Sequence, residues 1–264
     1  MAYRLKDRAI IALSGPDARS FLQGLITNDV DQLAPGKPLY AALLTPQGKI
    51  LFDFLLVDDG QGTILLDCSA TARNALQKRL SMYRLRAKVE IAPRDDLAVF
   101  AASGHTSLPG IVFEDPRLAT LGRRSIGPTS DGTDGYLAHR LALGVPEGAD
   151  FGSDKTFALD GGLDELHAIA FDKGCYVGQE LTARMKHRGT ARKRILPIET
   201  TDKSEIAAGT ELRAKDHVIG EIVSAFGSRG FALVRLDRLD DAGDAPIEAA
   251  GHSLHVTKPA WLSA

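Results

Sequence analysis

Residues 171–194 read FDKGCYVGQELTARMKHRGTARKR. Gly174 and Gly178 mark a loop in which the backbone can turn sharply or come close to a ligand. Gln179 and Glu180 then begin a pattern that fits a helix to about His187. This glycine-containing loop, the helix that follows it and the basic residues at its end are the most informative stretch of the chain.

Cys175 lies in this loop, just before the expected helix. The partial positive charge of a helix N-terminus, together with the nearby Lys173, favours the thiolate form, which can act as a nucleophile or a metal ligand. The alternative is a small buried hydrophobic residue, which is how most free cysteines behave. The residues alone leave both interpretations open.

The composition of the whole chain limits the class of protein. It has 264 residues, of which 44% are hydrophobic and 25% charged, the balance of a soluble globular protein rather than a disordered one. The length suggests about two domains. The longest apolar runs are far shorter than the roughly 18 residues of a spanning helix, and we expect no secretory signal. We therefore expect no membrane partner and a location in the bacterial cytoplasm, or in the mitochondrial matrix if the sequence is a trimmed eukaryotic chain.

Basic residues gather in two runs. Residues 73–88 and residues 184–194 each contain six basic residues and no acidic one. Either run alone could be a solvated face of a helix or strand. Together they favour a binding surface for an acidic ligand, such as a folate tail, a phosphate backbone or an acidic protein.

The N-terminal part of the chain predicts α+β architecture with largely antiparallel sheet. Capping residues and helical spacing predict a helix over about 17–28, and a turn at Thr45–Gly48 joins a β-hairpin within 39–57. A strand at 63–67 precedes a helical pattern that starts near residue 69. Further strands are expected at 86–91 and 97–101.

The later part of the chain changes character twice. Residues 104–134 are rich in Gly, Pro, Ser and Thr, which indicates loops and edge strands at a subdomain boundary. Beyond about residue 191, short strand candidates follow one another with no convincing helix between them, and one of them runs over 230–236. This pattern predicts a small terminal β-barrel or sandwich.

The chain has two cysteines, Cys68 and Cys175. Their contexts are unrelated, so we expect neither a disulfide framework nor a resident metal site. Cys68 follows an apolar strand and is expected to be structural.

The motif KGCYVGQE, residues 173–180, resembles the signature of the folate-binding YgfZ family, whose relatives include the glycine-cleavage T-protein, an aminomethyltransferase. Other segments are similar to family landmarks in the same order along the chain: 15–29, 45–49 and 140–147. Three stretches look especially similar to the mitochondrial iron–sulfur cluster assembly branch: 75–78, 83–89 and 178–184. The likeness therefore spans most of the chain.

This resemblance implies an α+β, T-protein-like fold around a central cavity. Residues 1–190 would form a folate-binding region of two interleaved, ferredoxin-like α+β subdomains with a boundary near 104–134, and residues 191–264 a C-terminal β-barrel. The implied function is a tetrahydrofolate-binding accessory factor for assembly or repair of iron–sulfur proteins, chiefly those with [4Fe–4S] clusters, without a necessary turnover of its own. The implied partners are folate, iron–sulfur scaffold or carrier proteins and client [4Fe–4S] enzymes, with a cluster held only transiently.

The family's functional positions carry over residue by residue. Those implied for chemistry are Cys175 and Lys173. Those implied for cofactor binding within the motif are Gly174, Tyr176, Gly178, Gln179 and Glu180. Cys175 would either help to hold or transfer a cluster with ligands from a partner, or attack a one-carbon or sulfur species; both roles stay open.

The basic runs gain a candidate role from the same resemblance. A guanidinium group matches the planar geometry of a carboxylate. Four arginines are therefore expected to pair with the glutamyl carboxylates of a folate: Arg84, Arg86, Arg184 and Arg188. The pterin and benzoyl rings would need an apolar slot, and its candidate linings are Tyr40, Phe52, Phe54 and Tyr136.

Two further functions are considered. A tetrahydrofolate-dependent aminomethyl- or methyltransferase would need a base or carboxylate near the folate nitrogen, for which Asp53 is a weak candidate. Nucleic-acid binding related to transfer-RNA modification would use the basic runs, but few aromatic residues accompany them for base stacking. We rank the transferase second and nucleic-acid binding third.

Overall fold

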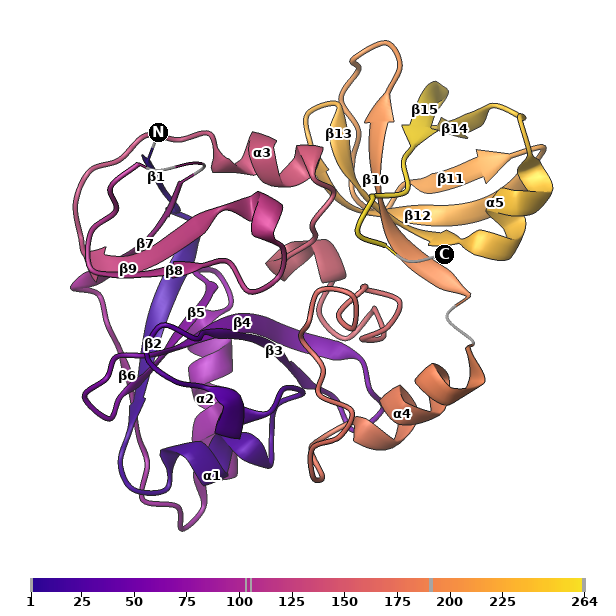
Figure 1. Cartoon of the computed structure of the whole chain (residues 1–264). Coiled ribbons are helices and arrows are strands. Elements are labelled where there is room, and N and C mark those ends of the chain that lie inside the picture. Colours follow the sequence, from indigo (N-terminus) through magenta and orange to yellow (C-terminus); the bar gives the residue numbers. More distant parts are fainter. Residues whose placement is uncertain (1, 103, 105, 190–191, 263–264) are drawn as a thin grey trace.

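The structure, a computed structural model, describes residues 2–102, 104, 106–189 and 192–262. Its described part contains two antiparallel sheets that face each other and a closed C-terminal barrel (Figure 1). The expected boundary between residues 190 and 191 lies outside the described residues. None of the described helices is long and apolar enough to cross a membrane.

The first sheet has the strand order β3-β4-β5-β2-β6. Its strands are β2 (Arg8–Ser14), β3 (Leu39–Leu44), β4 (Ile50–Asp58), β5 (Ile64–Ser69) and β6 (Glu90–Pro93). Helices α1 (Ala18–Gln23) and α2 (Arg73–Arg84) pack on one face of it, through Leu22 and Leu76 among others. The hairpin predicted within 39–57 is confirmed.

The second sheet has the order β1-β7-β9-β8. Its strands are β1 (Ala2–Arg4), β7 (Leu97–Ala102), β8 (Ile111–Glu114) and β9 (Arg123–Pro128), followed by α3 (Tyr136–Ala142). Short 3-10 turns are η1 (Val30–Gln32), η2 (Ala119–Leu121) and η3 (Gly148–Phe151). The chain changes sheet between Pro93 and Leu97, and residues 104–134 contain β8 and β9.

Both faces of the first sheet are buried, which explains why its strands are almost continuously apolar. In β2, Ile11 and Leu13 face α1 and α2, whereas Ile10 and Ala12 face the second sheet. Successive side chains of a strand point to opposite faces. The same alternation turns the charged residue Asp67 of β5 toward the layer between the two sheets.

The barrel closes in the order β10-β13-β12-β11-β14-β15. Its strands are β10 (Lys193–Thr200), β11 (Glu211–Ala214), β12 (His217–Phe226), β13 (Arg229–Arg235), β14 (Ile247–Ala249) and β15 (His252–Val256). The prediction that no helix interrupts them is wrong, because α5 (Leu236–Ala242) follows β13 directly. Leu236, Leu239 and Ala242 recur at helical spacing and pack on the barrel core.

Two predicted elements are shorter than expected. The helix predicted over 17–28 ends at Gln23, and the chain then joins the first sheet: the Thr27 amide donates to the carbonyl of Ala42 at 3.0 Å. The strand predicted over 86–91 begins at Glu90. The preceding residues form a turn that brings Val89 back into the core.

Candidate functional site

The motif segment forms an exposed loop followed by α4 (Gln179–Arg188), as its sequence predicts. The thiol of Cys175 is exposed. The interpretation of Cys175 as a buried hydrophobic residue is therefore wrong, and the chain presents this sulfur to its surroundings.

Lys173 anchors the loop to the end of α1. Its ammonium donates to the backbone carbonyls of Gln23, Ile26 and Asn28 at 2.8, 2.9 and 2.7 Å. Burial lowers the pKa of Lys173 to about 8, although Asp29 and Asp31 act in the opposite direction. In this position Lys173 fixes the loop that carries Cys175 two residues later.

Gly178 fixes the other side of the loop. It begins α4 with a left-handed φ of 84°, a conformation that glycine adopts without cost. A Cβ atom at this position would lie 2.5 Å from the carbonyl oxygen of Thr45, in the turn between β3 and β4. A Cβ at Gly174 would meet nothing within 4 Å. Packing therefore explains the glycine at 178 and leaves the one at 174 without an internal reason.

The remaining motif residues divide between core and surface. Tyr176 is buried in the core between the sheets, and burial raises the pKa of its hydroxyl to about 12. Its ring lies 5.3 Å from the Lys173 ammonium, measured to the ring centroid. Gln179 is half-buried and Glu180 exposed at the start of α4. Tyr176 thus supports the loop from inside.

The four arginines expected to bind a folate tail lie on two different helix ends. Arg184 and Arg188 are exposed on α4, and Arg84 and Arg86 are exposed at the end of α2. Arg84 donates to the carbonyl of Val89 at 3.4 Å. Among the described residues, the other three have no ion-pair partner within 4.0 Å. The structure therefore leaves these guanidinium groups open to ligands from outside the chain.

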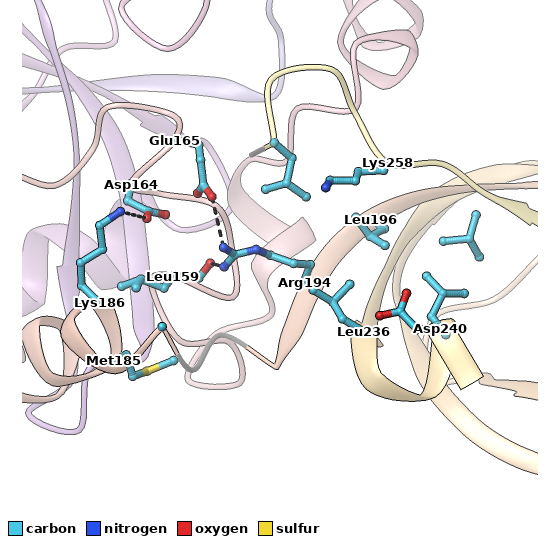
Figure 2. A pocket seen from close by; sticks show the side chains of 14 residues that line it. Leu159, Asp164, Glu165, Met185, Lys186, Arg194, Leu196, Leu236, Asp240 and Lys258 are labelled. Carbon is cyan, nitrogen blue, oxygen red and sulfur yellow. Dashed lines mark hydrogen bonds and ion pairs between the residues drawn. The ribbon is translucent and has the colours of Figure 1, made fainter. Parts of the chain in front are cut away.

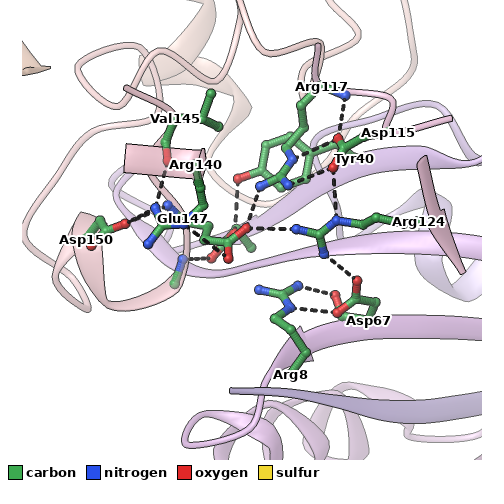
Figure 3. Close-up of polar contacts among 12 residues, drawn as sticks. Arg8, Tyr40, Asp67, Asp115, Arg117, Arg124, Arg140, Val145, Glu147 and Asp150 are labelled. Carbon is green, nitrogen blue, oxygen red and sulfur yellow. Dashed lines mark hydrogen bonds and ion pairs between the residues drawn. The ribbon is translucent and has the colours of Figure 1, made fainter. Parts of the chain in front are cut away.

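A buried network of arginines and carboxylates fills the layer between the sheets (Figure 3). Arg124 contacts Asp67 at 2.8 Å, Asp115 at 2.9 Å and Glu147 at 3.1 Å. Arg117 contacts Asp115 at 2.8 Å and Glu147 at 2.6 Å. Further pairs extend the network at its two ends: Arg8–Asp67 at 2.6 Å, Arg140–Glu147 at 3.5 Å and Arg140–Asp150 at 2.5 Å.

Electrostatics keep this network charged. Burial alone would raise the pKa of Glu147, but Arg117, Arg140 and Arg124 outweigh it and hold the pKa well below its usual range. Asp53 is different. Burial raises its pKa, and its oxygens accept from the Tyr40 hydroxyl at 3.0 Å and the Gly148 amide at 2.9 Å.

A cavity of about 410 Å³ lies where the two sheets and the barrel meet. Arg8, Arg140 and Glu147 of the network line it, together with Tyr136 and with Phe226 of the barrel. Asp150 also lines it, and one of its buried carboxylate oxygens has no hydrogen-bond partner among the described residues. None of the arginines expected to hold a folate tail lines this cavity.

The candidate linings for folate rings are mostly core residues. Tyr40 and Phe54 are fully buried and Phe52 is partly buried, whereas Tyr136 alone of the four lines the cavity of about 410 Å³. Cys68, expected to be structural, is buried within β5, and its thiol lies 3.5 Å from the carbonyl oxygen of Ala9. Burial raises the pKa of this thiol to about 12.

A second cleft, of about 610 Å³, lies between the barrel on one side and α4 with the segment 159–165 on the other (Figure 2). Arg194 at the start of β10 contacts Glu165 at 3.1 Å, and Lys186 of α4 contacts Asp164 at 2.9 Å. Burial and the neighbouring Asp164 raise the pKa of Glu165 to about 7, against the opposing effect of Arg194. This carboxyl pair therefore lies at the joint between the barrel and the rest of the chain.

The buried network is not among the sites that the sequence predicts. A signal was present, because Asp67 stands alone in the apolar run ILLDCS and Asp53 in ILFDFLLV. A charged residue inside a strand that is buried on both faces must be paired. The partners are far away in sequence, so their identity could not be read from the pattern.

Comparisons with known proteins agree with this architecture. Residues 7–108 match the family model of the GCVT N-terminal domain, and residues 192–264 match that of the CAF17 C-terminal β-barrel domain. A crystal structure of the glycine cleavage system aminomethyltransferase T from Bartonella henselae superposes with a TM-score of 0.76 at 18% identity, over 99% of this chain and 86% of that one. The chain therefore has the T-protein-like α+β fold with a C-terminal barrel.

Sequence relatives extend the agreement. The human mitochondrial iron–sulfur cluster assembly factor IBA57 is 34% identical, over 98% of this chain and 84% of its own length. The mouse protein of the same name is 32% identical over 90% and 78%. A homologue from Mycosarcoma maydis is 34% identical over 94% and 68%. The more specific YgfZ resemblance concerns a related branch and is not confirmed by these matches.

Proposed function

Because the chain belongs to the family of the iron–sulfur cluster assembly factor IBA57, we propose that it assists the assembly or repair of iron–sulfur proteins, chiefly those with [4Fe–4S] clusters. The observation that carries this proposal is the exposed thiol of Cys175 on a loop held by Lys173 and Gly178. The expected partners are iron–sulfur scaffold or carrier proteins and client [4Fe–4S] enzymes.

In this function Cys175 would act as a single ligand to an iron–sulfur cluster. Its thiol releases a proton to solvent, and the thiolate donates an electron pair to an iron of a cluster that a partner delivers. The second cysteine of the chain, Cys68, is buried. A cluster that needs several thiolates is therefore completed by the partner, which makes the contact transient.

We further propose that the chain binds tetrahydrofolate. The cavity of about 410 Å³ has the size of a small-molecule site. The unpartnered oxygen of Asp150 offers an acceptor for an amino group of a pterin, and Tyr136 and Phe226 offer apolar surface. The bound folate would supply a carrier for a one-carbon unit, and these residues of the chain would bind and orient it.

The transferase alternative is less well supported. Asp53, its candidate base, is buried, and both of its oxygens already accept hydrogen bonds from Tyr40 and Gly148. Burial also raises the pKa of this carboxyl above its usual value. No observation of the structure specifically favours nucleic-acid binding.

The names of the relatives place those proteins in mitochondria. Of the two expected locations, the mitochondrial matrix is the one that this supports, and the bacterial cytoplasm stays a prediction.

The deciding experiment is genetic. The gene is deleted in its host, and the activity of a [4Fe–4S] enzyme such as aconitase is measured per amount of enzyme protein. We expect a loss that the wild-type chain restores and Cys175→Ala does not, whereas Cys68→Ala serves as the control that removes the other thiol. Normal activity in the deletion strain would contradict the assembly role. Full restoration by Cys175→Ala would contradict the role of this thiol.

A further inference from the structure

The end of α2 exposes large apolar side chains. Leu85, the residue after the helix, is 89% exposed, and Met82 in the last turn is 62% exposed. A single exposed leucine has no special meaning. Here two neighbouring apolar side chains project from one helix end, and they stand among basic residues.

Leu85 also adopts an unfavourable backbone conformation. Its φ is 44° and its ψ is −106°, a positive-φ conformation outside the left-handed helical region that glycine adopts far more readily than leucine. The turn is needed because the chain must return Val89 to the core, and the Ala87 amide closes it by donating to the carbonyl of Arg84 at 2.7 Å. The fold requires the turn, but nothing inside the chain requires a leucine there.

Basic residues predominate at this end, although the Asp17 carboxylate accepts a hydrogen bond from the Lys88 amide and Glu90 begins the next strand. Residues 73–88 contain no acidic residue. Arg84, Arg86 and Lys88 flank Leu85, and their side chains are exposed. Two exposed apolar side chains beside guanidinium and ammonium groups complement an apolar hollow rimmed by carboxylates.

This helix end is joined to the Cys175 loop through α1. At the start of α1, the Lys88 amide donates to Asp17 at 2.7 Å. At the other end of α1, Lys173 donates to the carbonyl of Gln23. Since α1 spans Ala18–Gln23, about two turns, the end of α2 and the loop of Cys175 flank one short helix at the same end of the molecule (Figure 1).

We propose that Met82, Leu85, Arg84, Arg86 and Lys88 form a docking surface for an acidic partner protein that inserts these apolar side chains into a carboxylate-rimmed hollow while it meets Cys175. The identity of the partner rests on the proposed function, because a protein that exchanges a cluster with Cys175 must touch this end of the molecule. The docking surface supplies the specificity and the loop supplies the thiol.

The first test uses photocrosslinking in the host with the full chain. A benzoylphenylalanine residue replaces Leu85 in one strain and the exposed Asp172 in another, so that Cys175 is kept in both. We expect both positions to become linked to the same protein, and the peptide linked to position 85 to contain apolar residues flanked by Asp or Glu. Different proteins at the two positions, or no protein at position 85, would overturn the proposal.

The second test removes the surface while the thiol stays. Arg84→Glu with Arg86→Glu should lower the adduct at position 172 by about tenfold or more. Lys155→Glu with Lys258→Glu makes the same change of net charge at exposed positions outside this surface and should leave the adduct unchanged. An equal loss of adduct in both double variants would show that net charge alone causes the effect, and would overturn the proposal.

Leu85→Gly separates docking from folding. Glycine accepts the positive φ, so the variant should unfold at the same or a higher temperature than the wild type. The adduct at position 172 should nevertheless fall several-fold, because the apolar side chain is lost. An undiminished adduct in this stable variant would contradict the role of Leu85.

A membrane is the competing occupant of a basic, apolar surface. Vesicles of equal parts phosphatidylglycerol and phosphatidylcholine serve as the probe in a flotation assay. We expect the wild-type chain not to float with them. Flotation that disappears in Leu85→Gly would overturn the protein partner in favour of a lipid surface.

The enzyme assay distinguishes failure of this proposal from failure of the proposed function. Unimpaired aconitase rescue by Arg84→Glu with Arg86→Glu, beside failed rescue by Cys175→Ala, would refute the docking surface and keep the assembly role. A deletion strain with normal aconitase would refute the assembly role, while the adducts at position 85 would still test the docking surface.

Discussion

The layer between the two sheets and the end of the molecule that carries Cys175 use arginine in opposite ways. In the layer, Arg117 and Arg124 are buried and each contacts more than one carboxylate. At the exposed end, Arg86 and Arg184 have no ion-pair partner among the described residues. The buried arginines therefore hold the sheets together, and the exposed ones remain available to a partner.

Substitution of a buried and of an exposed arginine should have very different effects on stability. Arg124→Ala removes the common partner of Asp67, Asp115 and Glu147 and leaves buried carboxylates uncompensated, which should lower the free energy of unfolding by about 3–5 kcal/mol. Arg184→Ala should change it by less than about 0.5 kcal/mol. Urea unfolding of both variants measures the difference. Similar losses would show that the network does not set the stability.

The two glycines of the motif differ in the same way within one loop, since only Gly178 is packed against its neighbours. Gly178→Ala places a Cβ against the carbonyl of Thr45 at a positive φ, and should cost about 2–4 kcal/mol of unfolding free energy. Gly174→Ala meets open space and should leave stability unchanged or slightly higher. Thermal unfolding checks both. A clear loss of stability in Gly174→Ala would contradict the open space around this residue.

Lys173 belongs to both regions, since it is half-buried and yet supports the exposed loop. Lys173→Met leaves three carbonyls without their donor and should cost about 1–3 kcal/mol. Lys173→Arg keeps donors at this place and should cost less. Hydrogen exchange should show faster exchange in α1 for the methionine variant only. Unchanged exchange there would mean that the ammonium does not hold the loop.

The carboxyl pair at the barrel joint gives the smallest expected effect and one of opposite sign. The pKa of Glu165 is raised to about 7, against roughly 4.3 in an unfolded chain. Between these values the folded chain binds more protons, so this residue makes stability fall as the pH rises, and the effect is complete above pH 7.

Glu165→Gln removes this titration and should raise stability at pH 8 by on the order of 1 kcal/mol relative to its effect at pH 4. The network carboxylate Glu147 has a lowered pKa, so its contribution is present above about pH 4 and disappears on acidification below that value. Unfolding curves of both proteins from pH 3 to pH 8 provide the measurement. The same pH slope in wild type and Glu165→Gln would contradict the assignment.

Much of the fold could be predicted from local patterns. The hairpin of β3 and β4 followed from its turn residues, and the barrel from short strands in succession. The helix α5 was missed because Leu236 continues the apolar pattern of β13. The end of α1 was misjudged because apolar residues continue at helical spacing after Gln23, although Thr27 already bonds to the first sheet.

The site was predictable where its residues are neighbours in sequence. The motif loop, the start of α4 and the place of Cys175 followed from one continuous segment. The burial of Tyr176 could not be predicted in this way, because the core that covers it is built from residues far away in the sequence. The ion pair between Arg124 and Asp67 joins residues 57 positions apart, and no local pattern specifies such a partner.

The anchor of Lys173 also has a consequence for synthesis of the chain. The carbonyl of Asn28 accepts a hydrogen bond from Lys173, which lies 145 residues later in the sequence. As the polypeptide leaves the ribosome from its N-terminus, the first sheet can form early, but the end of α1 must rely on water until the motif has emerged. We expect a nascent chain released before residue 173 to exchange its amide hydrogens rapidly after α1. The segment that carries Cys175 would then also complete the hydrogen bonding of this part of the chain.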